Sequence, residues 1–140
     1  MLNFTAGARS LDGSVRHQVD VNGRHVAVTD LPANLGGTNA GPAPHELLAA
    51  MFASCVSTMI ALYGQSRNLD LEGLAVDVHY RADVTPRLLE TTVHVPPGLS
   101  ARETESLRRV VETCPVRRAL EAGFTFRDHL LVDDVYATAA

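Results

Sequence analysis

The stretch from residue 41 to residue 67, GPAPHELLAAMFASCVSTMIALYGQSR, decides the fold because it predicts a long apolar helix. Its proline at position 44 suits the first position of a helix, where a backbone N–H is not needed. Glu46 follows in the first turn, where the helix dipole favours an anion. Apolar residues then recur at spacings of three and four, at Leu48, Phe52, Cys55, Met59 and Leu62. Further apolar residues flank this stripe, so we expect a helix over about 44–67 that is buried on nearly all sides.

Upstream of this helix, the sequence predicts a β-hairpin. Residues 14–30, SVRHQVDVNGRHVAVTD, alternate around Asn22-Gly23, which is the strongest short-range hairpin signal. Residues 2–7 predict an earlier strand. The following segment LPANLGGTNAGPAP is too long for a tight turn, and loops of this kind are often functional.

Downstream, two more segments with period-two alternation predict a second hairpin, at residues 74–84 and 88–96. The final segment FTFRDHLLVDDV, residues 124–135, predicts a last strand. We find no repeat or linker, so the sequence predicts a single domain over 1–140. Hairpins combined with helices, without alternating βαβ units, indicate an α+β fold.

Two shorter helices are expected between the second hairpin and the last strand. Ser100 and Glu103 have the spacing of a capping box at the start of an amphipathic helix. Pro115 ends that helix. Residues from Pro115 onward predict a short helix that stops at Gly123.

Composition excludes several classes of protein. The 140 residues are 46% hydrophobic and 20% charged, which is typical of a globular protein. The net charge of −4 argues against a nucleic-acid partner. We see no uninterrupted run of 18 apolar residues and no secretory signal, so we expect a cytoplasmic protein without a membrane partner.

The chain contains two cysteines, Cys55 and Cys114, 59 positions apart. Two thiols are too few for a structural zinc site, which usually has four protein ligands. The histidines outside the central helix lie in predicted strands without metal-ligand spacing, so no metal is expected. A permanent disulfide is not expected in a reducing cytosol. Two inert buried thiols or a redox pair remain as interpretations.

The two cysteines have different predicted surroundings. Cys55 lies about three turns into its helix, where the dipole of the helix start has faded and burial raises the thiol pKa. It therefore needs a nearby cation to act as a nucleophile, and without one it is a core residue. Cys114 precedes Pro115 and so lies at a helix start, which favours a thiolate. A peroxidase that attacks with one sulfur and resolves with the other fits this pattern.

The block GG…GPAPHELLAAMFASC, the following VSTMIALYGQSRNLDLEGLAVDV and the distal CPVRRAL resemble the OsmC/Ohr family of osmotically inducible and organic hydroperoxide resistance proteins. The proline-rich lead-in is closer to the OsmC-like branch, and the resemblance covers nearly the whole chain. It implies an OsmC-like fold, in which antiparallel sheets wrap around a long buried central helix in an intertwined homodimer. It also implies two active sites at the subunit interface.

The resemblance further implies thiol-dependent reduction of organic hydroperoxides, in defence against oxidative stress. Cys55 matches the peroxidatic cysteine, and Cys114 matches the resolving cysteine, whose disulfide an external dithiol reopens. No metal, haem or flavin is implied as a cofactor. Apolar neighbours of Cys55, among them Phe52 and Met59, favour alkyl peroxides over hydrogen peroxide.

The sequence departs from the family pattern at the residues that activate the thiolate. In the characterised peroxidases an arginine holds the thiolate, and a glutamate ten residues before the cysteine holds the arginine. His45 stands ten before Cys55, and Glu46 stands nine before it. We expect Glu46, or else His45, to take this role. Alternatively, Glu46 only complements the helix dipole.

Helix geometry constrains the site further. Nine residues at about 100° each place Glu46 and Cys55 on opposite faces of a straight helix. The sequence therefore predicts composite sites, with both cysteines from one chain and Glu46 and the arginine from the other. Arg16 fits the activating arginine slightly better than Arg9.

Two alternatives to a peroxidase stay open at this point. The chain could be a non-catalytic dimer that binds a small apolar or thiol-bearing ligand, which the missing glutamate favours. It could instead be a redox sensor that passes a Cys55–Cys114 disulfide on to a partner. The distance between the two sulfurs and the position of an arginine near Cys55 separate these interpretations.

Overall fold

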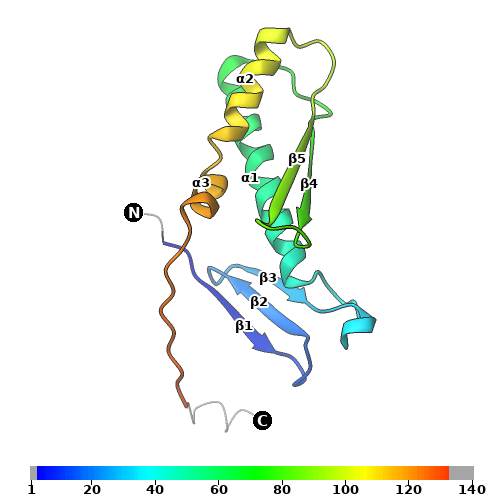
Figure 1. Ribbon diagram of the computed structural model, residues 1–140, viewed down its shortest axis with the longest axis vertical. Coiled ribbons are helices and arrows are strands. Elements are labelled where there is room, and N and C mark those ends of the chain that lie inside the picture. Colours follow the sequence, from blue (N-terminus) through cyan, green and yellow to red (C-terminus); the bar gives the residue numbers. More distant parts are fainter. Residues whose placement is uncertain (1–2, 133–140) are drawn as a thin grey trace.

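The computed structural model describes residues 3–132 of the chain and has the expected α+β class with antiparallel sheets. A three-stranded sheet lies beyond one end of a layer made of helices and a hairpin (Figure 1). The elements follow the order β1 (Ala6–Ser10), β2 (His17–Val21), β3 (His25–Thr29), the 3-10 helix η1 (Ala33–Leu35), α1 (Pro44–Arg67), β4 (Ala75–Arg81), β5 (Leu88–His94), α2 (Ala101–Glu112) and α3 (Pro115–Ala122).

The first sheet has the antiparallel order β1-β2-β3. The hairpin of β2 and β3 turns at Asn22 and Gly23. Their φ angles of 53° and 65° are the left-handed values that a tight hairpin turn requires. This confirms the predicted hairpin. The earlier strand runs over Ala6–Ser10, a few residues later than the predicted 2–7.

A buried carboxylate organises the long loop between β3 and α1. Asp30 is only 1% exposed. It accepts hydrogen bonds from the backbone N–H groups of Leu31, Thr38 and Ala40 at 2.8, 3.0 and 2.9 Å. It also accepts one from the Thr38 hydroxyl at 2.6 Å. Its own N–H donates to the Pro42 carbonyl, so Asp30 ties together both ends of the loop that leads into α1.

Glycines allow this loop to fold tightly on itself. A Cβ at position 37 would lie 1.9 Å from the Leu31 carbonyl oxygen, and one at position 41 would lie 2.1 Å from that of Val28. Both distances are too short for any residue with a Cβ atom to fit without moving the backbone. Gly37 and Gly41 are therefore required by the packing of the loop around Asp30.

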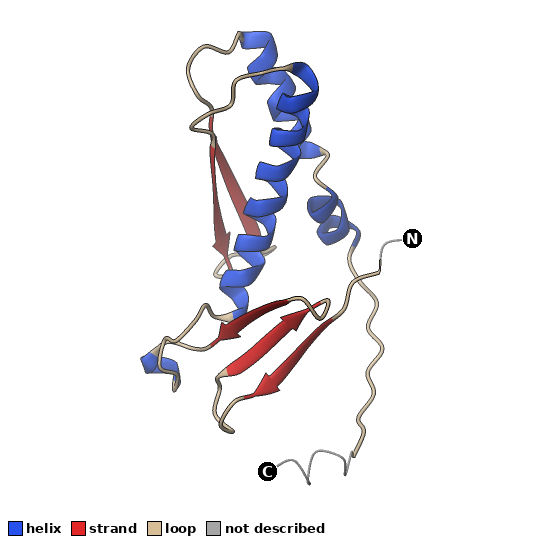
Figure 2. Cartoon of the chain, turned by 180° about the vertical axis from the view of Figure 1, so that it is seen from behind, coloured by secondary structure: helices blue, strands red, loops and turns tan. Residues whose placement is uncertain are grey.

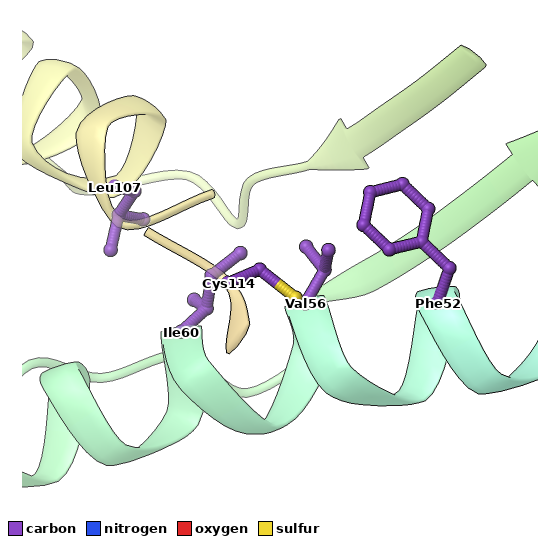
Figure 3. Close-up of a cluster of buried hydrophobic side chains, with 5 residues drawn as sticks. All are labelled: Phe52, Val56, Ile60, Leu107 and Cys114. Carbon is purple, nitrogen blue, oxygen red and sulfur yellow. The ribbon is translucent and has the colours of Figure 1, made fainter. Parts of the chain in front are cut away.

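Helix α1 has the predicted bounds and forms the centre of the core. Its buried positions are spaced by four residues, at Phe52, Val56, Ile60 and Gly64. The first three of these pack with Leu107 of α2 and with Cys114, as Figure 3 shows. The buried stripe is therefore rotated around the helix relative to the predicted one, since Phe52 is the only one of the five predicted residues that is buried.

The opposite side of α1 is exposed in this chain. Met51 and Leu62 are 44% and 55% exposed. An 18-residue window of α1 has a mean hydropathy of 1.8, and 22% of it is buried. This length and composition would allow α1 to cross a membrane, although core helices of soluble proteins share both properties.

The second hairpin and the two shorter helices match their predictions. Strands β4 and β5 pair antiparallel, with Ala75 opposite His94. Helix α2 begins with the predicted capping box, in which the Ser100 hydroxyl accepts from the Glu103 N–H at 3.2 Å and the Ser100 N–H donates to Glu103 at 2.7 Å. Both α2 and α3 pack against α1.

The predicted last strand is wrong for the part of it that is described. Residues 124–132 form no strand, and the segment joins neither sheet (Figure 2). Phe126 and Leu130 are 85% and 95% exposed. A strand needs a neighbouring strand to hydrogen-bond with, and the described chain offers this segment none. Residues 133–135 of the prediction lie outside the described residues.

Candidate functional site

The fold brings the two cysteines together. The Cys114 Sγ lies 3.0 Å from the Cys55 Sγ, and both thiols are free. A disulfide bond measures about 2.05 Å, so a small approach of the two sulfurs suffices to form one. The two thiols are therefore close enough to act as a redox pair, which is one of the two interpretations that the sequence left open.

Packing, and not the chain between them, positions the two sulfurs. Cys55 lies on α1, next to the buried Val56, and is partly exposed. Cys114 is fully buried and immediately precedes α3, with its sulfur pointing toward α1 (Figure 3). Pro115 occupies the first position of α3, as predicted. The end of α2 and the start of α3 thus hold Cys114 against the middle of α1.

The surroundings of Cys55 keep its thiol protonated in the single chain. Burial raises the pKa of Cys55, and the hydrogen bond with the Cys114 thiol raises it further. The backbone N–H of Val116 acts in the opposite direction and lowers this pKa. None of these influences comes from an arginine of the described chain. Attack on a peroxide needs the thiolate, so the site requires an additional cation to be reactive.

The Val116 contact was not predicted from the sequence. Cys55 lies too far along α1 for the start of its own helix to help it. The structure instead brings the start of α3 to Cys55, and Val116 is the second residue of that helix. The Cys-Pro-Val sequence, with a proline at a helix start, was the available signal.

Arg9 lies on β1 and Arg16 in the turn between β1 and β2, and neither influences the Cys55 thiol of the same chain. Arg16 ends the turn between β1 and β2, and its Nη2 lies 2.9 Å from the Asp12 Oδ2. Arg9 is exposed on β1, opposite Gln18. The single chain therefore brings neither arginine to Cys55.

Glu46 and His45 are engaged at the start of α1. The Glu46 Oε2 accepts a hydrogen bond from the Ala43 N–H at 2.7 Å, which closes the helix start. The His45 ring stacks on Tyr80 of β4, with centroids 5.9 Å apart and planes inclined by 18°. Both lie more than two turns before Cys55, and the chain does not bring them to the sulfurs.

A groove with a volume of about 640 Å³ runs between β5 and α2, but its lining includes neither sulfur. Apolar side chains such as Val93, Val95, Leu107 and Val111 form most of its floor. Within residues 3–132, no three potential metal ligands cluster closely enough to hold an ion.

The family model of OsmC-like proteins matches residues 37–127 of the chain. This match covers α1, the second hairpin, α2, α3 and both cysteines. No curated protein sequence shows significant similarity to the chain.

Solved structures with a similar fold share little sequence. A candidate osmotic stress induced and detoxification response protein from Psychrobacter arcticus is 22% identical, covers 81% of this chain and 85% of its own, and has a TM-score of 0.69. An organic hydroperoxide resistance protein OsmC from Legionella pneumophila is 24% identical over 86% and 90%, with a TM-score of 0.61. An organic hydroperoxide resistance protein from Elizabethkingia anophelis is 22% identical over 84% and 87%, with a TM-score of 0.61.

Proposed function

Because the chain belongs to the family of OsmC-like proteins, we propose that it is a cysteine-based peroxidase that reduces organic hydroperoxides. The observation that carries this proposal is the distance of 3.0 Å between the Cys55 and Cys114 sulfurs. Two similar structures belong to organic hydroperoxide resistance proteins, which supports the same substrate class. The two free thiols suit a reducing compartment, and we place the protein in the cytoplasm.

The proposed cycle uses sulfur chemistry alone. The Cys55 thiolate attacks one oxygen of the hydroperoxide O–O bond, giving a sulfenic acid and an alkoxide, which takes up a proton to become an alcohol. The Cys114 thiol then attacks the Cys55 sulfenic sulfur, forming the disulfide and releasing water. An external dithiol reduces this disulfide to the two thiols and is itself oxidised.

We assign Cys55 to the peroxidatic role because it is the more accessible of the two thiols. Cys114 is fully buried against α1 and cannot meet a peroxide before Cys55 does. Phe52, one turn before Cys55, gives the site an apolar wall. Burial of each methylene of an alkyl chain contributes about 0.8 kcal/mol, so the site favours alkyl hydroperoxides.

The active unit in this proposal is a homodimer. The chain exposes 10927 Å² of surface. A folded monomer of 15.0 kDa is expected to expose only about 7,000 Å². The exposed side of α1 and the uncovered three-stranded sheet account for part of this excess, and exposed apolar surface of this kind marks an interaction site. A second copy that covers them brings Arg16 of one subunit to the cysteines of the other.

We expect the wild-type protein to sediment as a dimer of twice 15.0 kDa. Leu62→Asp, on the exposed side of α1, places a charge in the proposed interface and should shift the protein to monomer. Sedimentation velocity at micromolar concentration measures this. A matched control is Leu35→Asp, since Leu35 is similarly exposed (62%) in the loop before α1. A wild-type monomer contradicts the dimer and its composite site.

The peroxidase proposal is tested by intact mass after brief exposure of reduced protein to cumene hydroperoxide or hydrogen peroxide. We expect the organic peroxide to react faster. Wild type should lose the mass of two hydrogen atoms, Cys114→Ser should gain one oxygen, and Cys55→Ser should not change. If neither thiol reacts faster than free cysteine, the proposal is wrong, Cys55 is a core or pocket-lining residue, and the ligand-binding interpretation takes its place.

A further inference from the structure

The turn between β1 and β2 is built around Asp12. Its Oδ1 accepts a hydrogen bond from the Ser14 N–H at 3.0 Å and another from the Ser14 hydroxyl. That hydroxyl oxygen accepts the Arg16 N–H at 3.2 Å. The Leu11 N–H donates to the Arg16 carbonyl at 3.2 Å. These contacts fix the backbone of Arg16 relative to the Asp12 carboxylate.

The same carboxylate also holds the Arg16 side chain. The Arg16 Nη2 donates to the Asp12 Oδ2 at 2.9 Å. The Arg16 Nε is buried and finds no hydrogen-bond partner among the described residues. A buried donor without an acceptor is costly and is rarely left so in a working assembly. Arg16 is thus oriented from one side of its guanidinium, while its Nε still lacks an acceptor.

Neither the other arginines of the three-stranded sheet and its turns nor Glu46 has this arrangement. Within residues 3–132, the side chains of Arg9 and Arg24 form neither a hydrogen bond nor an ion pair and are exposed. The Glu46 carboxylate is already engaged with the Ala43 N–H at the start of α1. Asp12 is therefore the carboxylate that the structure places on an arginine of this sheet.

We propose that Asp12 is the positioning residue for Arg16, in the role that the sequence first suggested for Glu46. This inference rests on the proposed function, in which Arg16 of one subunit meets Cys55 of the other. Asp12 holds Nη2, so the N–H groups of the guanidinium other than the buried Nε–H can face the thiolate. A guanidinium retains its charge at any working pH, and a fixed orientation lets it stabilise the thiolate without reorganising.

The test compares single variants in the full-length protein with Cys114→Ser, so that only Cys55 reacts. The rate of alkylation by iodoacetamide between pH 5 and pH 10 reports the Cys55 thiolate. Asp12→Asn should move the midpoint of this profile upward by about one unit, because Arg16 is no longer held. Arg16→Ala should move it at least as far. Asp20→Asn, which removes the charge of the carboxylate that accepts the Gly23 N–H in the other turn of the same sheet, should not move it.

A double variant separates positioning from any independent effect of Asp12. Asp12→Asn combined with Arg16→Ala should behave like Arg16→Ala alone, because the carboxylate acts only through the guanidinium. In the protein with both cysteines, Asp12→Asn should lower kcat/KM for cumene hydroperoxide about tenfold. The exposed pair contributes little to stability, so the melting temperature should remain near that of wild type.

Glu46→Gln is the competing variant, and it should lower the melting temperature while moving the alkylation profile less than Asp12→Asn does. If Glu46→Gln moves the profile more, or if Asp12→Asn moves it equally with and without Arg16, the inference is wrong. Failure of the proposed function appears differently. In that case wild-type Cys55 does not react with peroxides, although its alkylation still depends on Asp12.

Discussion

Replacement of Cys55 by serine is expected to lower kcat/KM for cumene hydroperoxide by about 10³-fold or more, because the reacting sulfur is removed and a serine hydroxyl is not ionised at neutral pH. The substitution is nearly isosteric in a partly buried site. The melting temperature should therefore change little. Peroxide consumption with excess dithiol measures the effect.

Cys114→Ser is the matched control for this experiment. Without added dithiol, it should reduce one equivalent of peroxide per subunit at nearly the wild-type rate and remain a sulfenic acid, because no disulfide forms. Equal turnover by Cys55→Ser and wild type would show that Cys55 is only a core residue. A first equivalent that depends on Cys114 instead would reverse the assigned roles.

Asp30→Asn is expected to destabilise the fold strongly. The amide nitrogen that replaces one carboxylate oxygen would face N–H groups of the loop, which leaves buried donors unpaired. We expect the melting temperature to fall by roughly 10 °C at pH 7. Asp70→Asn is the control, because Asp70 lies outside the core and accepts one backbone N–H, from Glu72.

The effect of Asp30 should also depend on pH. Its hydrogen bonds lower the pKa of the Asp30 carboxyl below the ordinary value of 3.8. The carboxylate therefore stabilises the fold fully above that value, and this contribution is lost as pH falls toward the folded-state pKa. Thermal melts from pH 7 to pH 3 should show the gap between wild type and Asp30→Asn narrowing below about pH 4. A gap that is constant or widens in acid contradicts the role of the ionised carboxylate.

Local sequence signals predicted most of the secondary structure. The bounds of α1, the Asn22-Gly23 turn and the Ser100–Glu103 capping box depend on residues within a few positions of each other. Such interactions can be read from spacing alone. The proline at the first position of α3 similarly predicted that Cys114 lies at a helix start, which the structure bears out.

Features that depend on distant partners could not be predicted in this way. Helix α1 is apolar on most sides, so its sequence does not indicate which side packs against α2. The buried stripe includes Val56 and Ile60, whereas the predicted stripe included Cys55 and Leu62. The segment 124–132 has a strand-like pattern but no neighbouring strand in the described chain. The roles of Asp30 and Asp12 depend on loop geometry that no short motif indicates.

The contact between the two sulfurs has a kinetic consequence for any reductant. Packing holds Cys114 beside Cys55 at a high effective concentration, although 59 residues separate them in the chain. A monothiol that attacks the oxidised pair forms a mixed disulfide next to the freed cysteine. That cysteine can expel the monothiol and re-form the Cys55–Cys114 disulfide before a second monothiol arrives. A reductant with two thiols has its own second sulfur equally near, so we expect dithiols to outcompete monothiols even at equal reduction potential.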